Sequence, residues 1–353
     1  MSKNQTMARD TIIYMLAKGI EGVVGVLTIS AMSYIYLPEQ IGKYSAINIA
    51  ITTLAMVSTN WITHAMLRYV NKYKIENNLN KFYSSIFISW FKINFFIVVL
   101  SSLLILLVSG NRSITGNYPI SLLGVSLGMY CTYNTSQLTI ALLAGVQKSK
   151  LNLMLSIINS IGKFVSIIVL NKLFEPRIEW IFLSYIVFDF VVCAIGLSKL
   201  NIYSYISKKD YDKEVLSVLK AYGFPLMGNM IATSILNKSD IYIITSFLGE
   251  NKAGIYQTNY SIIASAFILL ATGAMRGSYP TILKTWSEGN LKEAEGLLRN
   301  ATRTYLLISI PAVVGVGCIS DILAQVLFDE LYWEGHHIMT SVALGMMMLG
   351  LTE

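Results

Sequence analysis

The chain has 353 residues, of which 54% are hydrophobic and 13% are charged, and its mean hydropathy is +0.57. Soluble domains carry roughly 25% charged residues, so this composition excludes an ordinary soluble enzyme or binding module. The formal net charge of +7 raises the question of a nucleic-acid partner, which the positions of the basic residues answer below.

The apolar residues fall in blocks of about 20, the length that a helix needs to cross the hydrocarbon core of a bilayer. Backbone groups must be paired in lipid, and the alternating pattern typical of membrane β-barrels is absent, so the spans should be helices. We predict an all-α, polytopic membrane protein with ten spans at 11–36, 45–67, 83–108, 118–145, 151–171, 178–199, 219–247, 254–279, 302–328 and 335–352. The first span is too long for a signal peptide, so we expect it to be retained.

The first two spans carry unusual polar groups. Lys18 and Glu21 in span one are three residues apart and share a helix face, so they either neutralise each other or face a cavity. Span two ends inside at Arg68, and its polar side chains should hydrogen-bond between helices or line a wet cavity. They are Asn48, Thr52, Thr53, Ser58, Thr59, Asn60, Thr63 and His64.

A short pattern follows span one and returns after span seven. Residues 37–44 and 248–256 both read L-x-E, a spacer, and then G-x-Y. Six spans separate the two copies, so both should lie at equivalent outer positions of two parallel repeats. We expect Gly42 and Gly254 to permit tight turns into the next helix. The charged inner segment 200–218 would then join an N-lobe, 1–205, to a C-lobe, 206–353.

Span seven holds the most polar stretch of the second half. Asn237, Lys238 and Asp240 lie there, and Lys238 and Asp240 point in opposite directions because they are two residues apart on a helix. Each therefore needs a partner elsewhere, which for Lys238 is either an anionic ligand or an acid on another helix. Pro225, near the start of the span, is expected to kink it.

The sequence gives no sign of a catalytic or metal site. Cys131, Cys193 and Cys318 lie inside spans as packing residues, and His336–His337 has no partner at ligand spacing. A P-loop, a nucleophile elbow and a zinc motif are all missing. We predict a protein that is not an enzyme, has no cofactor, and draws energy from a Na⁺ or H⁺ gradient or from the gradient of its substrate.

The basic residues indicate a membrane topology. Lys and Arg gather on the cytoplasmic side of membrane proteins. With a cytoplasmic N-terminus, 18 of the 27 basic residues fall in inner segments, and the outer loops hold only Lys43, Arg112, Lys172, Arg177 and Lys252. We therefore predict a cytoplasmic N-terminus, a cytoplasmic 200–218 segment and no nucleic-acid partner.

The motifs together resemble those of the polysaccharide-biosynthesis transporters, the O-antigen flippase family of the multidrug/oligosaccharidyl-lipid/polysaccharide superfamily. The matching segments are the two L-x-E…G-x-Y loops, Gly223-Phe224-Pro225-Leu226, Phe247-Leu248-Gly249, Tyr279-Pro280, Trp286-Ser287-Glu288-Gly289-Asn290 and Ile310-Pro311. The resemblance covers nearly the whole chain. It implies two pseudo-symmetric six-helix lobes around a central cavity lined by helices one, two, seven and eight. Family members have twelve to fourteen spans, so the second lobe should be incomplete here.

The resemblance also implies a function in the bacterial inner membrane. The protein would move an undecaprenyl-diphosphate-linked oligosaccharide, an O-antigen or capsule repeat unit, from the cytoplasmic to the outer leaflet by alternating access. Its partners would be that glycolipid, membrane lipids, and a glycan polymerase or other assembly proteins. The cavity residues would be Lys18, Glu21, Asn60, Arg68, Asn237, Lys238 and Arg276, and the gating or lobe-contact residues would be Asp240, Gly42, Gly254 and Pro225. For Arg68 and Arg276, snorkelling to the membrane interface is an equal alternative.

Two other functions remain open at this stage. A multidrug or toxic-compound exporter of the same superfamily would need an acidic, cation-free cavity, which Lys18 and Lys238 argue against. A membrane glycan polymerase or ligase would need a large periplasmic loop, and the predicted outer segments are short.

Overall fold

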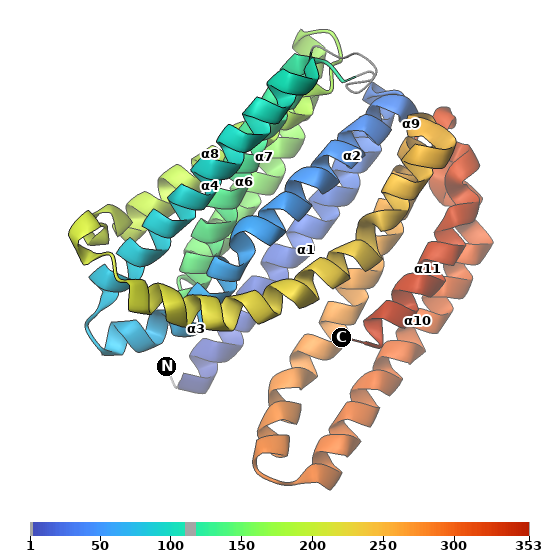
Figure 1. The fold of residues 1–353 in the computed structure, drawn as a ribbon. Coiled ribbons are helices and arrows are strands. Elements are labelled where there is room, and N and C mark those ends of the chain that lie inside the picture. The colour runs from blue at the N-terminus through green and yellow to red at the C-terminus, as the bar shows by residue number, and fades with distance from the viewer. Residues whose placement is uncertain (1–2, 110–117, 353) are drawn as a thin grey trace. The chain divides into compact units, whose positions relative to one another are not determined.

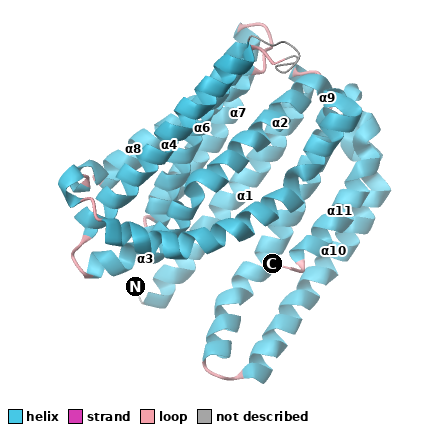
Figure 2. Cartoon of the chain, in the orientation of Figure 1, coloured by secondary structure: helices cyan, strands magenta, loops and turns pink. Residues whose placement is uncertain are grey.

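The structure, a computed structural model, describes the backbone of residues 3–109 and 118–352. The side chains of 3–18, 108, 109, 272, 274–278 and 280 lie outside the description. Within the described ranges the chain is built of helices and turns and contains no strand, as Figures 1 and 2 show. The prediction of an all-α fold is confirmed.

The helices follow one another with short connections. They are α1 (Lys3–Ile35), α2 (Pro38–Ala55), α3 (Trp61–Ile75), α4 (Leu79–Ser109), α6 (Ile120–Gly145), α7 (Ser149–Leu173), α8 (Glu179–Leu200), α9 (Lys213–Ser287), α10 (Leu291–Leu327) and α11 (His336–Gly350). A π-helical turn (Met56–Asn60) joins α2 to α3, and 3₁₀ turns lie at Ile202–Tyr205, Lys208–Asp210 and Glu330–Gly335.

The ten predicted spans correspond to ten helical segments over the described residues, once α9 is divided at its break and α2, the π-helical turn and α3 are counted as one segment. Gly249 has φ 85° and ψ 171°, which interrupts the helix between spans seven and eight. Six stretches are long and apolar enough to cross a membrane, by length and composition: Pro38–Ile75, Leu79–Leu107, Ser149–Leu173, Glu179–Leu200, Lys213–Ala271 and Leu291–Leu327. The chain is a multi-pass membrane protein.

Left-handed residues end several helices and let the chain reverse quickly. Asn77, Gln147 and Asn201 have φ of 56°, 57° and 52°, and Gly289 has φ 80°. They follow α3, α6, α8 and α9, the positions where a residue in this conformation terminates a helix and satisfies its last carbonyl groups.

The chain packs as two compact units. The first comprises Met1–Tyr14 and Tyr44–Ile243, and the second Met15–Lys43 and Ile244–Glu353. The boundaries fall inside helices α1, α2 and α9 and do not follow the 200–218 segment. The division into two pseudo-symmetric lobes therefore stays a prediction.

In the first unit α8 packs against α6 and α7, and α3 packs against α4 and α6. A buried apolar cluster fills the α3 end of this bundle, and it includes Trp61, Ile62, Met66, Phe82 and Leu138. The linker between α8 and α9, residues 201–212, is held against α4. Ser84 and Ser85 of α4 form hydrogen bonds of 2.9–3.1 Å with its backbone.

A buried ion pair also holds the first unit together. The Lys163 ammonium on α7 lies 2.7 Å from Asp189 Oδ1 on α8, and Asp189 is 1% exposed. The same oxygen accepts a hydrogen bond from Asn159 at 3.1 Å. Burial of a carboxylate in an apolar bundle is tolerated here because the charge is paired.

In the second unit, α10 and the part of α9 after Gly249 form a hairpin closed at Gly289, with α11 alongside α10 (Figure 1). The Tyr332 hydroxyl donates to the Tyr36 carbonyl at 2.7 Å, and the Asn259 amide donates to the Tyr332 carbonyl at 3.1 Å. Buried hydrogen bonds between helices thus replace the hydrophobic driving force that lipid does not supply.

Candidate functional site

Lys238 lies in a strip of polar side chains that connects α9 to α2 within the first unit. Its ammonium donates a hydrogen bond to Thr52 Oγ1 at 3.0 Å. One turn earlier, Ser234 Oγ and Thr53 Oγ1 are 3.4 Å apart, and one turn later the Tyr242 hydroxyl donates to a backbone carbonyl of α2 at 3.4 Å. The sequence placed these residues on spans seven and two, and the structure brings the two spans together.

Lys238 is half-buried, and none of the described carboxylates lies within 4 Å of its ammonium. Asp240, close in sequence, accepts the backbone N–H of the residue after it at 2.9 Å. Asp189 on α8 is paired with Lys163. An ammonium carries three N–H donors, and Thr52 takes one, which leaves donors for water or for an anionic ligand.

Other polar residues of span two join helices. Ser58 Oγ lies 2.9 Å from the Tyr130 hydroxyl, and Thr59 Oγ1 donates to Asn134 Oδ1 at 2.8 Å, both on α6. Ser58 and Thr59 belong to the π-helical turn Met56–Asn60. Insertions of this kind recur at functional sites, and nothing in the sequence pattern announced this one.

The structure describes the side chains of some of the remaining predicted cavity residues and not of others. Asn60 and Asn237 are half-buried, and Glu21 is half-buried and engaged with a neighbour. The side chains of Lys18 and Arg276 lie outside the described residues.

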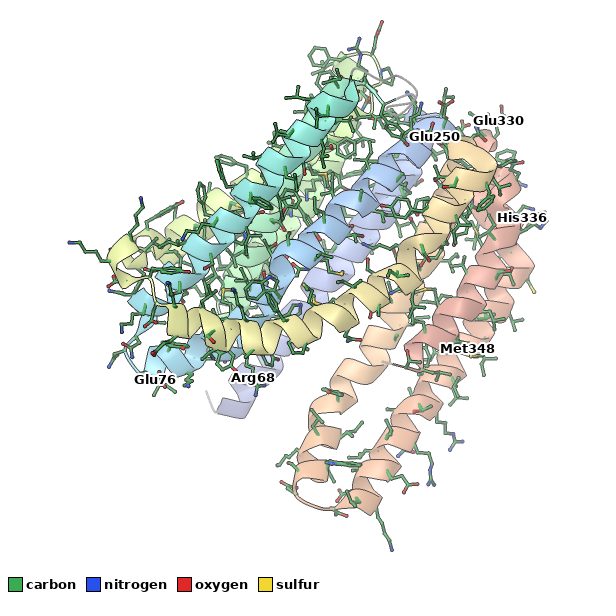
Figure 3. All side chains as sticks on the ribbon, viewed as in Figure 1. Arg68, Glu76, Glu250, Glu330, His336 and Met348 are labelled. Atoms are coloured by element: carbon green, nitrogen blue, oxygen red, sulfur yellow. The ribbon has the colours of Figure 1, made fainter. Side chains whose placement is uncertain are left out.

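Arg68 lies in the middle of α3, close to the first turns of α9 (Figure 3). Its guanidinium carbon is 4.8 Å from the centre of the Tyr222 ring, a cation–π distance, and the side chain remains exposed. A Cβ on the neighbouring Gly223 would lie 2.6 Å from the Trp61 carbonyl oxygen, and the Phe224 ring is 4.9 Å from that of Trp61. The Gly-Phe pair of this motif therefore serves a tight helix–helix contact.

The two L-x-E…G-x-Y segments meet in the second unit. A Cβ on Gly42 would lie 2.0 Å from the Glu250 carbonyl oxygen, and one on Gly254 would lie 1.8 Å from that of Pro38. Each glycine faces the residue four positions before the other glycine, so the contact is nearly symmetric. The expected tight turns are wrong, because both glycines are helical and the positive φ belongs to Gly249.

Charges reinforce this contact. The Lys43 ammonium lies 2.6 Å from Glu39 on its own helix and 3.4 Å from Glu250 on α9. Figure 3 shows Glu250 with Glu330 and His336 at one end of the unit, while Met348 lies further along α11. Lys43 had been counted only as an outer-loop charge, because no sequence pattern links it to Glu250.

Pro225 and Asp240 were also predicted to act in gating. Pro225 is exposed and lies in α9, whose only described departure from helical geometry is at Gly249. The gating roles of both residues stay predictions.

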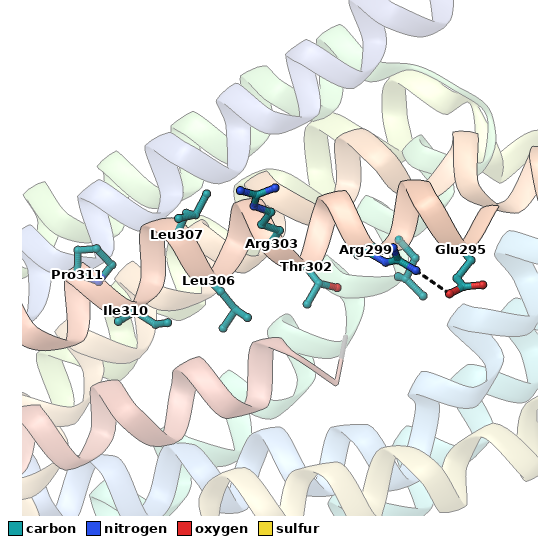
Figure 4. Close-up of a pocket in the computed structure, with 9 residues that line it drawn as sticks. Glu295, Arg299, Thr302, Arg303, Leu306, Leu307, Ile310 and Pro311 are labelled. Carbon is teal, nitrogen blue, oxygen red and sulfur yellow. Dashed lines mark hydrogen bonds and ion pairs between the residues drawn. The ribbon is translucent and has the colours of Figure 1, made fainter. Parts of the chain in front are cut away.

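A groove with a volume of about 680 Å³ lies along α10 (Figure 4). Its lining comes from α10 alone: Glu295, Leu298, Arg299, Thr302, Arg303, Leu306, Leu307, Ile310 and Pro311. Arg299 pairs with Glu295 at 3.0 Å. A groove formed by one helix is an open surface and does not enclose a ligand.

Comparisons with known proteins agree with this architecture. A family model described as "Polysaccharide biosynthesis protein" matches residues 7–286. A comparison with curated protein sequences gives no match.

Solved structures with similar folds are transporters. A MATE protein in a straight conformation is 13% identical with a TM-score of 0.61, over 98% of this chain and 81% of its own. An outward-facing multidrug resistance MATE family transporter of the MOP superfamily is 14% identical with a TM-score of 0.59, over 99% and 82%. The Vibrio cholerae MATE transporter VcmN in a bent form is 15% identical with a TM-score of 0.50, over 99% of this chain and 87% of its own. At these identities the likeness is one of fold.

Proposed function

The chain belongs to the polysaccharide biosynthesis protein family, and from this premise we propose that it is a flippase for a lipid-linked oligosaccharide. It would move an undecaprenyl-diphosphate-linked O-antigen or capsule repeat unit from the cytoplasmic to the outer leaflet of the bacterial inner membrane by alternating access. A Na⁺ or H⁺ gradient, or the gradient of the glycolipid itself, would drive the movement, and a glycan polymerase or other assembly proteins would receive the product.

The observation that carries this proposal is Lys238. A half-buried ammonium whose one hydrogen bond among the described residues goes to a threonine hydroxyl is suited to attract a concentrated negative charge. In a low-dielectric cleft that attraction is several times stronger than in bulk water. A diphosphate linker supplies this charge, and the surrounding Thr and Ser hydroxyls can donate further hydrogen bonds to its oxygens.

The fold itself also suits a multidrug exporter, since the similar solved structures include one by its title. Lys238 favours the anionic glycolipid over a cationic drug, because a like charge in the site would repel the drug. Export of a cationic dye by the reconstituted protein, without any effect of Lys238 substitutions, would favour the exporter.

The test uses proteoliposomes loaded with a fluorescent diphosphate-linked oligosaccharide, with its glycan probed from outside by a glycosidase. We expect Lys238→Ala to abolish translocation while the protein still inserts, and Lys238→Arg to retain part of it because the positive charge persists. Lys172→Ala, which removes an exposed lysine at the end of α7, is the matched control and should transport normally. Full translocation by Lys238→Ala would refute the role of Lys238.

A further inference from the structure

Another groove, which carries two lysines, lies on the first unit between α4 and the linker that follows α8. Its volume is about 470 Å³, and it is lined by Phe87, Ile88, Trp90, Phe91, Lys92, Ile206 and Lys208. It includes no residue of α2 or α9, the helices that hold Lys238, so it is separate from the proposed transport site.

The linker wall of this groove is held in place. Ser84 Oγ on α4 donates to the Tyr205 carbonyl at 3.0 Å and accepts from the Ser207 N–H at 2.9 Å. Ile206 is therefore fixed between two anchored residues. The ammonium of Lys92, on α4, lies 4.9 Å from the centre of the Tyr211 ring, so this side chain bends toward the linker.

The groove carries two positive charges without a compensating acid. Among the described residues, neither Lys92 nor Lys208 has a carboxylate within 4 Å, and no lining residue is acidic. The linker acid Asp212 lies 3.5 Å from Lys81, which is outside the groove lining. A groove of this charge is complementary to an anion.

An apolar strip continues from the groove along α4. Phe91 and Phe95 are 64% and 63% exposed and their rings stack at 6.2 Å. Val99, Leu103 and Leu107 follow at intervals of one helical turn and are also exposed. In a membrane-spanning helix such a strip faces hydrocarbon, and a long lysine side chain on that helix can extend its ammonium along the helix toward the headgroup level.

We propose that this groove binds an anionic phospholipid of the bilayer. Lys92 and Lys208 contact the headgroup phosphate, Trp90 and Phe91 lie at the interface between headgroup and acyl chain, and one acyl chain follows the strip along α4. Aromatic residues favour this interfacial depth. Through Ile206 and Lys208 the bound lipid would fix the linker against α4.

The test measures quenching of tryptophan fluorescence in nanodiscs that contain dibrominated phosphatidylglycerol or dibrominated phosphatidylcholine. Trp90→Phe isolates the emission of Trp90 from that of the other tryptophans. We expect phosphatidylglycerol to be preferred at Trp90, with each lysine contributing roughly fivefold. Lys92→Gln/Lys208→Gln should abolish the preference. The control is Lys209→Gln/Lys213→Gln, which removes the same amount of charge from residues that do not line the groove, and it should keep the preference.

Three results would overturn the proposal. Trp90 could be quenched equally by the two lipids in the native protein, or the preference could survive in Lys92→Gln/Lys208→Gln. In the third case, a polyprenyl diphosphate added to the nanodiscs displaces the brominated phosphatidylglycerol at lower mole fraction than unlabelled phosphatidylglycerol does. That result would assign the groove to the transported glycolipid, whatever the role of Lys238.

Discussion

Gly42 and Gly254 matter for the space they leave. A real Cβ does not approach a carbonyl oxygen to 2.0 Å or 1.8 Å, so any larger residue would push α2 and α9 apart. The charges of Lys43 and Glu250, 3.4 Å apart across the same contact, would separate with them. The motif thus couples close backbone packing to an ion pair.

Replacement of either glycine by alanine should destabilise the protein. We expect Gly42→Ala and Gly254→Ala each to cost about 1–3 kcal/mol, the usual penalty for overpacking a tight contact. Thermal unfolding in detergent, followed by intrinsic fluorescence, measures the effect. Gly345→Ala is the control, because a Cβ there meets nothing within 4 Å, and it should be neutral or slightly stabilising. Equal midpoints for all four proteins would contradict the packing role.

The Lys163–Asp189 pair allows a sharper test of charge. Removing one member of a buried pair leaves the other uncompensated, which costs about 3–5 kcal/mol, whereas apolar replacement of both is often nearly neutral. We therefore expect Asp189→Asn and Lys163→Met each to lower the unfolding midpoint strongly, and Lys163→Met/Asp189→Leu to recover most of the loss. Additive losses in the double variant would show that the two charges act independently.

These residues also mark how far the sequence could predict the site. It identified the glycines, because the two motif copies match, but their role depends on a neighbour that only the tertiary structure supplies. It identified Lys238 as a charge in need of a partner, and the structure added Thr52 at 3.0 Å. Lys163 and Asp189 were separated by a turn between helices, so their pairing could not be inferred from spacing.

At the scale of elements, the apolar blocks predicted the helices well and their ends poorly. Predicted spans eight and nine stop at 279 and begin at 302, whereas α9 continues to Ser287 and α10 begins at Leu291. Hydropathy detects only the hydrocarbon-buried part of a helix. The extensions are charged and carry i,i+4 pairs such as Arg299–Glu295 at 3.0 Å, which stabilise helices in water.

The linker before α9 is held by a helix cap that should respond to pH. Asp212 Oδ1 accepts the backbone N–H of Glu214 at 2.8 Å, and Lys81 lies 3.5 Å from Oδ2. The backbone hydrogen bond, aided by Lys81, lowers the pKa of Asp212 below its ordinary value of 3.8. A lowered pKa means that the cap stabilises the folded state above the ordinary pKa and is lost as pH falls through the lowered one.

We therefore expect amide protons at the start of α9 to lose protection from hydrogen exchange over a pH range from above the ordinary aspartate pKa of 3.8 to well below it, after correction for the intrinsic exchange rate. Asp212→Asn retains a capping oxygen without a titrating charge, so its protection should not change over this range. A native protein whose protection is the same at both ends of the range would contradict the role of Asp212.

At the scale of the whole molecule, the lobes that chain order predicts at 1–205 and 206–353 stay a prediction. Residues 15–43 pack with 244–353, where the Tyr332 hydroxyl reaches the Tyr36 carbonyl at 2.7 Å. The repeated motif shows only that an even number of membrane spans separates its two copies. It does not determine which helices share a core, because long-range contacts depend on side chains from both halves.

The orientation of the chain in the membrane is the last prediction, and it rests on the distribution of charge. The turns after α3, α6, α8 and α9 all fall on one side if every helical segment crosses the membrane, and most of the basic residues flank them. Because Lys and Arg are retained on the cytoplasmic side, this side should be cytoplasmic, together with the N-terminus. In a background without Cys131, Cys193 and Cys318, Asp210→Cys should resist an impermeant maleimide in intact cells and react after permeabilisation. Lys172→Cys, on the opposite side, should react in intact cells. The reverse pattern would invert the topology, and the proposed direction of glycolipid movement would then start from the wrong leaflet.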